Sequence, residues 1–119
     1  FLQKHSELEA ARSDYQVALE IKPDEASLYI NLAAMELRLF ETKLDIQLMA
    51  AAEKNLKQAE RLKSKSPALY FNRARLFELY NFPARARTAY REAMRYYPET
   101  SVEYQTCQTR VQRLSMQLK

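Results

Sequence analysis

The sequence ARTAYREAMRYYP, from Ala86 to Pro98, carries the pattern that decides the fold. Ala86, Tyr90 and Ala93 stand four and three residues apart, and Pro98 follows five residues later. The same intervals recur in two sets further upstream, namely Ala11, Tyr15, Ala18 and Pro23, and Ala52, Leu56, Ala59 and Ser64. Spacings of three and four residues place side chains on one face of an α-helix. Three copies of one helical pattern therefore predict a fold that is built by repetition.

The composition also favours an all-α protein. The chain has 119 residues, which support about one domain with its own hydrophobic core. It contains no glycine, whereas the tight turns between strands commonly require glycine at positive φ. Alanine, leucine and the long charged or amide side chains that favour helices dominate instead.

Net charge, cysteine content and the lengths of apolar runs narrow the possible function only a little. The net charge of +4, with both signs interspersed, is typical of a solvated surface. The single cysteine, Cys107, excludes an internal disulfide. No run approaches the roughly 18 apolar residues of a membrane span, and no signal peptide is recognisable, so cytoplasm and periplasm both stay open. Because the chain begins at Phe1 without an initiating Met, we expect a piece of a longer protein.

Prolines, capping residues and apolar stripes predict six helices. They are expected at about 7–22, 25–40, 43–63, 67–80, 84–96 and 101–119, after a frayed tail of an earlier helix over residues 1–6. Asp24 is expected to cap the second helix, and Thr42 the third in a capping box with Asp45. Pro67 is expected in the first turn of the fourth helix, and Thr100 or Ser101 at the cap of the last.

Helix pairs with Ala, a ring and Ala on the second helix, followed by proline, resemble tetratricopeptide repeats, which are helix–turn–helix units of about 34 residues. The first helices agree, because LYINLA at 28–33 parallels LYFNRA at 69–74. Tyr29 and Tyr70 then stand where the family has a large aromatic side chain. The resemblance implies a right-handed superhelix of antiparallel helix pairs, an α-solenoid of about six helices that ends in a capping helix.

The spacing between the copies divides the chain into repeats. Ala52 and Ala86 are 34 residues apart, whereas Ala11 and Ala52 are 41 apart, and the first helices show the same difference. We therefore expect a seven-residue insertion within about 38–51 that lengthens the middle helices by almost two turns. The single domain is expected to comprise a partial repeat over 1–25, a long repeat over 26–66, a regular repeat over 67–100 and a capping helix over 101–119.

Nothing in the sequence predicts catalysis. His5 is the only histidine and lies near the start of the chain, while Cys107 falls on the apolar stripe of the last helix. No Cys/His spacing suits zinc, and a phosphate-binding glycine loop cannot exist without glycine. Since catalysis needs an activated nucleophile, a tuned acid pair or a metal, we expect a non-enzyme without metal or cofactor.

Binding is what the resemblance implies. In the family the first helix of each pair lines a concave groove, and the Asn two residues after the aromatic often holds the backbone of a ligand peptide. We therefore expect a groove for a peptide or helix, from another protein or elsewhere in the parent chain. Its lining residues are expected to be Asn31, Ala34, Arg38, Phe71, Asn72, Arg75, Leu79, Thr109 and Arg113, with Thr106 beside them on the last helix. A structural role for Asn31 and Asn72, which would only tie neighbouring helices together, stays open.

A second function also stays open. Six arginines from Arg73 to Arg95, interleaved with tyrosines, make the regular repeat basic. The chain could thus bind a polyanion, either nucleic acid or an acidic polysaccharide, through the convex face of the second helix, for example as an envelope or secretion adaptor. The clamp that holds a chaperone's terminal carboxylate in some members of the family fits poorly, because Ala68 and Asn72 stand where it has basic residues.

Overall fold

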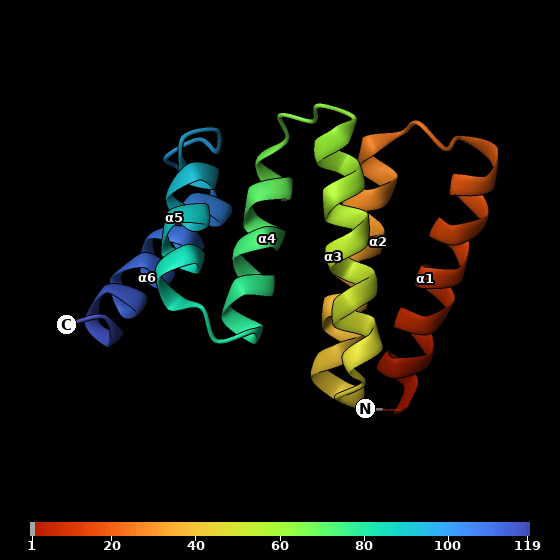
Figure 1. Cartoon of the computed structure of the whole chain (residues 1–119), viewed down its shortest axis with the longest axis horizontal. Helices are drawn as coiled ribbons and strands as arrows, with labels where there is room; N and C mark the ends of the chain where they lie inside the picture. The colour runs from red at the N-terminus through yellow and green to blue at the C-terminus, as the bar shows by residue number, and fades with distance from the viewer. Residues whose placement is uncertain (1) are drawn as a thin grey trace. The chain divides into compact units, whose positions relative to one another are not determined.

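Six α-helices follow one another along the chain. The structure, a computed structural model, describes residues 2–119 and the side chains from residue 4 onward. The helices are α1 (Leu2–Ile21), α2 (Ala26–Lys43), α3 (Ile46–Arg61), α4 (Pro67–Leu79), α5 (Pro83–Met94) and α6 (Val102–Gln117), as Figure 1 shows. No strand occurs within residues 2–119, so the predicted all-α class and the six helices are confirmed.

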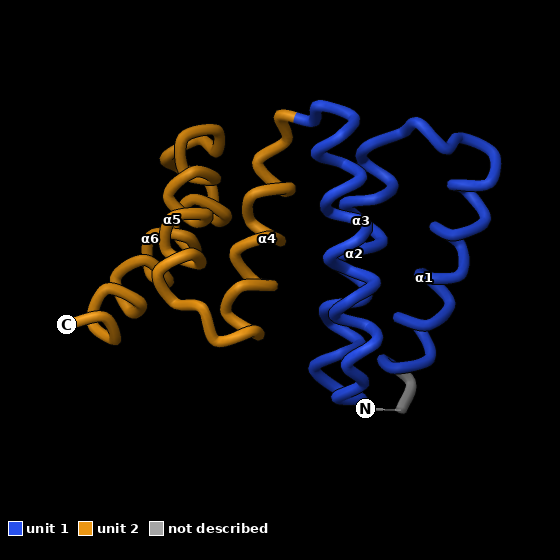
Figure 2. The backbone as a smooth tube through the Cα atoms, viewed as in Figure 1, with its two compact units in different colours: residues 1–64 blue, residues 65–119 orange. Residues whose placement is uncertain are grey.

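The helices form two compact units, Phe1–Ser64 and Lys65–Lys119 (Figure 2). In the first unit α1 packs on α2 and α2 on α3, and in the second α4 packs on α5 and α5 on α6. Each unit is therefore built from helices that are neighbours in the sequence. The division of the chain into repeats stays a prediction, although α2 and α3, with 18 and 16 residues, are longer than α4 and α5, with 13 and 12.

The repeated pattern, two alanines around a large apolar residue, lies in the core of each unit. Ala86, Tyr90 and Ala93 are completely buried in the second unit, where Cys107 and Leu114 of α6 pack around them. Small side chains at these positions let helices approach closely, and the ring fills the space that they leave. The middle copy is buried in the same way on α3, whereas the copy on α1 is half-buried, because α1 packs mainly on α2.

A buried carboxylate joins all three helices of the first unit. Glu36 of α2 has only 1% of its surface exposed. Its Oε2 accepts a hydrogen bond from Nε of Arg12, at 3.1 Å, and forms an ion pair with Nη2 of Arg12, also at 3.1 Å. Its Oε1 accepts a hydrogen bond from Nδ2 of Asn55, at 2.7 Å. Burial raises the pKa of Glu36, and the Asn55 and Arg12 bonds oppose that rise. The buried Glu36 carboxylate thus links α2 to α1 through the ion pair with Arg12 and to α3 through the hydrogen bond from Asn55.

The start of the chain differs from the expectation of a frayed tail. α1 begins at Leu2 rather than near residue 7, while Phe1 of the expected tail lies outside the described residues. Leu8 is buried with Leu39 and Leu48, which holds the early turns of α1 against α2 and α3. Burial of an apolar face stabilises a helix beyond the point where local sequence signals would end it.

The predicted cap of α2 is also wrong. The N–H of Glu25 donates to the carbonyl of Lys22, at 3.3 Å, and closes a turn across Pro23 and Asp24. Asp24 therefore lies within the turn before α2. Glu25 is the N-cap, and its side chain makes no hydrogen bond to the helix. By contrast, Pro67 lies in the first turn of α4 and Ser101 caps α6 by accepting from the N–H of Tyr104, as expected.

The turn between α2 and α3 lies further along than expected. Thr42 lies inside α2, where its Oγ1 donates to the carbonyl of Leu39 at 2.9 Å, so it does not cap α3. Asp45 is the N-cap, since its side chain accepts from the N–H of Gln47. Thr42 and Asp45 both suit a cap by residue type, and the helix begins after the second because Leu44 adopts the left-handed conformation that ends α2.

Three described residues other than glycine have positive φ, and each lies at a helix end: Leu44, Lys63 and Asn81. The N–H of Ser64 donates to the carbonyl of Ala59 and the N–H of Lys63 to that of Glu60, which is the Schellman pattern. Glycine commonly occupies the left-handed position of this motif, because a Cβ there costs about 1–2 kcal/mol. A chain without glycine therefore carries local strain at these turns.

Replacing Lys63 with Gly is expected to stabilise the protein by about 0.5–1 kcal/mol, because the relief of strain exceeds the entropy lost by glycine on folding. Urea denaturation of both chains measures the difference. Lys65→Gly is the matched control, since Lys65 is exposed and does not have positive φ. We expect the control to lose stability. Equal or lower stability of Lys63→Gly would show that this turn is not strained.

Candidate functional site

The predicted groove residues lie on three helices. Asn31, Ala34 and Arg38 follow one another on α2 in the first unit, where Asn31 and Arg38 are exposed and Ala34 is half-buried. The remaining residues belong to the second unit, with Phe71, Asn72, Arg75 and Leu79 on α4 and Thr109 and Arg113 on α6. The α2 residues are therefore part of the surface of the first unit, and the other six belong to the second unit.

Two of the α4 residues face inward. Phe71 meets the ring of Tyr90 edge-on, with 5.7 Å between the ring centroids. Asn72 is buried, and its Nδ2 donates to the carbonyl of Ala68 one turn earlier, at 2.9 Å. The donor side of the Asn72 amide is thus engaged within its own helix. Arg75 and Leu79, on the same helix, are half-buried.

Glu78 is the centre of a polar cluster that sequence analysis did not find. Its Oε1 accepts from the hydroxyl of Tyr90 and from Nη1 of Arg110, the latter at 3.1 Å, and its Oε2 lies 3.4 Å from Nη2 of Arg113. We call these four residues the Glu78 cluster. It brings together α4, α5 and α6, and it includes the predicted Arg113.

The members of the Glu78 cluster differ in how tightly they are held. Burial, followed by the hydrogen bond to Glu78, raises the pKa of Tyr90 well above its ordinary value, so this phenol stays neutral. The guanidinium of Arg110 lies over the Tyr90 ring, 6.0 Å from its centroid, and gains a cation–π contact besides the ion pair. The Arg113 side chain is 58% exposed, against 36% for Arg110 and 20% for Glu78. Arg113 is therefore the member that solvent, or a partner, reaches most easily.

A cleft of about 390 Å³ lies beside this cluster on α6. We call it the α6 cleft, and its lining residues are Val102, Gln105, Thr106, Thr109, Arg110 and Arg113. Oγ1 of Thr106 donates to the carbonyl of Val102, at 2.9 Å, and Oγ1 of Thr109 to that of Gln105, at 3.0 Å. Each hydroxyl proton is engaged in the helix, so both oxygens remain as acceptors for an incoming N–H group. Two predicted residues, Thr109 and Arg113, thus line one cleft.

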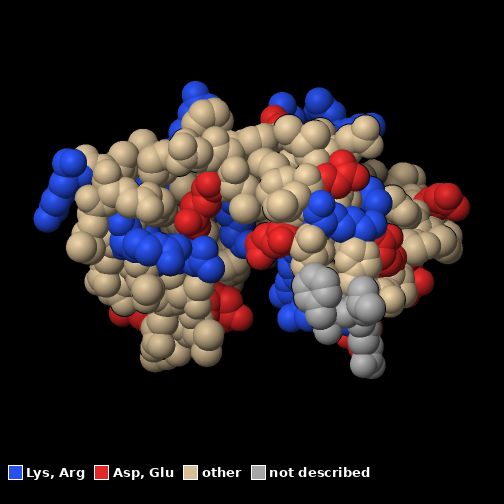
Figure 3. All heavy atoms as spheres, turned by 90° about the horizontal axis from the view of Figure 1, so that it is seen from below, with Lys and Arg blue, Asp and Glu red and all other residues tan. Residues whose placement is uncertain are grey.

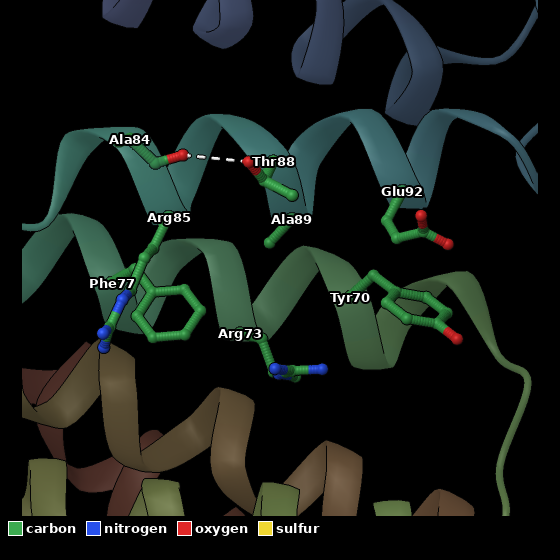
Figure 4. A pocket seen from close by; sticks show the side chains of 8 residues that line it. All are labelled: Tyr70, Arg73, Phe77, Ala84, Arg85, Thr88, Ala89 and Glu92. Carbon is green, nitrogen blue, oxygen red and sulfur yellow. Dashed lines mark hydrogen bonds between the residues drawn. The ribbon is translucent and has the colours of Figure 1, made fainter.

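A second hollow, of about 510 Å³, lies between α4 and α5 (Figure 4). We call it the α4–α5 hollow. Tyr70, Arg73 and Phe77 of α4 line one side of it, and Ala84, Arg85, Thr88, Ala89 and Glu92 of α5 line the other. None of these eight residues is among those predicted to form the groove. Their arginines are engaged with rings, since Arg73 lies over Phe77 and Arg85 over Phe82, at 5.9 and 5.4 Å from the ring centroids.

The arginines of α5 do not form a free basic stripe. Nη1 of Arg87 donates to Oγ of Ser115, at 3.3 Å, and its buried Nε finds no acceptor among the described residues. Arg95 pairs with Glu92, at 3.3 Å, while Arg91 is exposed. Figure 3 shows Asp and Glu side chains next to Lys and Arg on the face seen from below, rather than one continuous basic surface.

The thiol of Cys107 has no features of a nucleophile. It is completely buried on α6, and burial raises its pKa to about 11. Among the residues that the structure describes, no group of three or more His, Cys, Asp or Glu side chains could hold a metal ion. Over the same residues, no helix is both long and apolar enough to cross a membrane.

No protein-family model matches the chain, and no curated protein or solved structure matches it.

Proposed function

We propose that this chain is a non-catalytic interaction module that binds a peptide or helix, either from another protein or from another part of its own parent chain. The supporting observation is the α6 cleft, which lies beside the Glu78 cluster and is lined by Thr109 and Arg113. All of its lining residues lie on α6, so the cleft, of about 390 Å³, is an open groove along one face of this helix. A cleft of this size takes a few side chains of a partner.

The chemistry of the cleft suits a polypeptide. Thr106 and Thr109 offer oxygen acceptors one helical turn apart, and the amide of Gln105 can both donate and accept. The N–H groups of a peptide backbone are donors that such acceptors bind. Val102 is 76% exposed at the start of α6 and provides apolar contact area beside these polar groups. Exposed apolar side chains next to polar groups are typical of interfaces.

In the finer form of this proposal, the helices are tetratricopeptide-like pairs, and α6 is the capping helix of a right-handed superhelix. The support is the repeated pattern of two alanines around a large apolar residue, which is buried on both α3, with Leu56, and α5, with Tyr90, together with the packing of sequence neighbours on one another. Asn31, Ala34 and Arg38 would then be the contact surface that the first unit provides.

The polyanion alternative has weaker support. A basic face needs an excess of exposed cations, yet Arg87 is half-buried and donates to Ser115, and the charge of the exposed Arg95 is balanced by Glu92 at 3.3 Å. Binding of heparin or single-stranded DNA that falls steeply between low and moderate salt, and that Arg91→Glu weakens, would favour this alternative. Peptide binding in a cleft responds less to salt.

A tryptophan in the α6 cleft is expected to block binding. Peptides that bind the chain are first selected from a random library. Thr109→Trp is expected to weaken their binding at least tenfold, because the bulky indole would occupy part of the α6 cleft and obstruct the peptide. Thr88→Trp is the matched control, since Thr88 is also an exposed helical threonine that donates to the carbonyl four residues earlier, and it lines the α4–α5 hollow.

Calorimetry on both variants distinguishes the sites. Binding that survives Thr109→Trp but not Thr88→Trp would move the site to the α4–α5 hollow. A library that yields no binding peptide would contradict the proposed function itself.

A further inference from the structure

We infer that the α6 cleft recognises a carboxylate side chain, Asp or Glu, of an extended partner peptide, and that Arg113 is the residue that contacts it. This inference rests on the proposed function and specifies the chemistry of its partner. It follows from the balance of charge in the Glu78 cluster, from the exposure of its members and from the polar groups that line the α6 cleft.

The charges of the Glu78 cluster do not cancel. One carboxylate, Glu78, faces two guanidinium groups, those of Arg110 and Arg113. Tyr90 contributes no charge, because burial and the Glu78 carboxylate keep its hydroxyl protonated. One positive charge therefore remains at the edge of the α6 cleft. An acidic side chain is complementary to this charge, whereas a basic one would be repelled.

The two arginines have different roles. Arg110 is 36% exposed, lies over the Tyr90 ring and bonds to Glu78 at 3.1 Å, so packing fixes its position. Arg113 is 58% exposed, and its Nη2 lies 3.4 Å from Glu78, which is long for a charged hydrogen bond. Most of the five N–H donors of Arg113 are thus available to a ligand, and planar pairing of guanidinium with carboxylate uses two of them.

The only acid of α6 itself does not neutralise this charge. Glu103 is the single acidic residue between Val102 and Gln117. Its charge acts on Tyr97 and Cys107, whose pKa values it helps to raise. It is also absent from the lining of the α6 cleft. The closest acidic competitor for Arg113 is therefore Glu78.

The remaining cleft residues favour an extended peptide as the bearer of the carboxylate. The oxygens of Thr106 and Thr109 can accept N–H groups of a backbone, on the same surface as Arg113. A free dicarboxylate would offer no donor to these oxygens. The peptide backbone would thus lie along α6, with its acid at the Arg113 end of the cleft.

Glu78 is then an internal competitor for the same guanidinium. Glu78→Gln removes its negative charge but keeps an amide oxygen that can accept from Tyr90 and Arg110. We expect this change to tighten binding of an acidic peptide about threefold, because the cluster becomes more positive. A purely structural role for the cluster predicts no gain, so this variant separates recognition from folding.

The experiment uses the whole chain and peptides selected on it from a random library. The tightest peptide is synthesised with its acid and with the matching amide, Asn for Asp or Gln for Glu. Calorimetry compares the two peptides on the unmodified chain, on Arg113→Ala and on Arg91→Ala, which removes an exposed arginine of α5 as a matched control. Thermal unfolding of each variant verifies that it is folded.

We expect the exchange of acid for amide to weaken binding about tenfold on the unmodified chain and on Arg91→Ala, and to have almost no effect on Arg113→Ala. Equal losses on all three chains would mean that the acid contacts another residue, and would overturn the inference. Selected peptides without an enriched acid would also overturn it while leaving the proposed function in place. A library without binders would remove the proposed function as well.

Discussion

Replacing Arg12 with Met is expected to lower the free energy of unfolding by about 3–5 kcal/mol near neutral pH. The change leaves the carboxylate of Glu36 buried, with Asn55 as its remaining hydrogen-bond partner. An isolated buried charge costs far more than the loss of a surface ion pair, because neither water nor a counter-charge compensates it. Urea denaturation monitored by circular dichroism measures the loss.

The free energy of unfolding of Arg12→Met should depend strongly on pH. Burial raises the pKa of Glu36 above its ordinary value of 4.5, so the folded protein holds this proton more tightly than the unfolded chain does. Stability from this group is therefore complete below about 4.5 and declines as the pH rises through the folded-state pKa. Without Arg12, which lowers that pKa, the decline is larger. The defect of Arg12→Met is thus expected to shrink when the pH is lowered towards 4.5.

Two further variants complete this experiment. Glu36→Gln removes the buried charge, and an amide does not titrate. When this change is present, adding Arg12→Met should therefore no longer alter how stability depends on pH. Arg61→Met removes an exposed arginine of α3 that bonds only to Gln58 among the described residues, and should change stability by less than about 0.5 kcal/mol. A loss for Arg12→Met that is small and independent of pH would show that Glu36 is not held as a buried anion.

The second large effect is expected at Tyr90. Tyr90→Ala should lower the free energy of unfolding by about 3–5 kcal/mol, because the ring is completely buried in the core of the second unit, where it contacts Phe71, and its removal leaves a cavity. Tyr90→Phe keeps the ring and removes only the hydroxyl. It should cost about 1.5–3 kcal/mol, the contribution of a hydrogen bond to a charged group.

The series separates packing from hydrogen bonding. Tyr96→Phe is the control, since Tyr96 is exposed and stacks on Tyr70 through its ring, which the change preserves. It should alter stability by less than about 0.5 kcal/mol. Thermal denaturation of the three variants is sufficient. If Tyr90→Phe were as stable as the unmodified chain, the hydroxyl of Tyr90 would have no net role in holding α5 to Glu78.

The sequence predicted the helices well and their ends less well. The apolar stripe of α5 and the prolines in the first turns of α4 and α5 are local signals, and they place these helices within a few residues. The turn at Leu44 could not be predicted in this way, because a left-handed residue is normally marked by glycine and this chain has none. Thr42 then competes with Asp45 as a cap, and only the backbone conformation decides between them.

The candidate site could be predicted only in part. Thr109 and Arg113 were predicted as groove residues from the family resemblance, and both line the α6 cleft. Glu78 was missed because its partners come from α5 and α6, and no local pattern pairs residues so far apart in sequence. Glu36 did carry a signal, since this acid stands on the apolar stripe between Ala33 and Leu37. A charge at such a position indicates a buried pair, but not that Arg12 is the partner.

The burial of Cys107 makes its thiol a natural probe of how often the second unit opens. The chain has no second thiol, and this one can react with a disulfide reagent only after α6 has moved away from α5. Because the folded thiol is also protonated at neutral pH, the native state itself contributes almost nothing to the reaction. The labelling rate of Cys107 therefore reports how often the second unit opens, without any engineered probe.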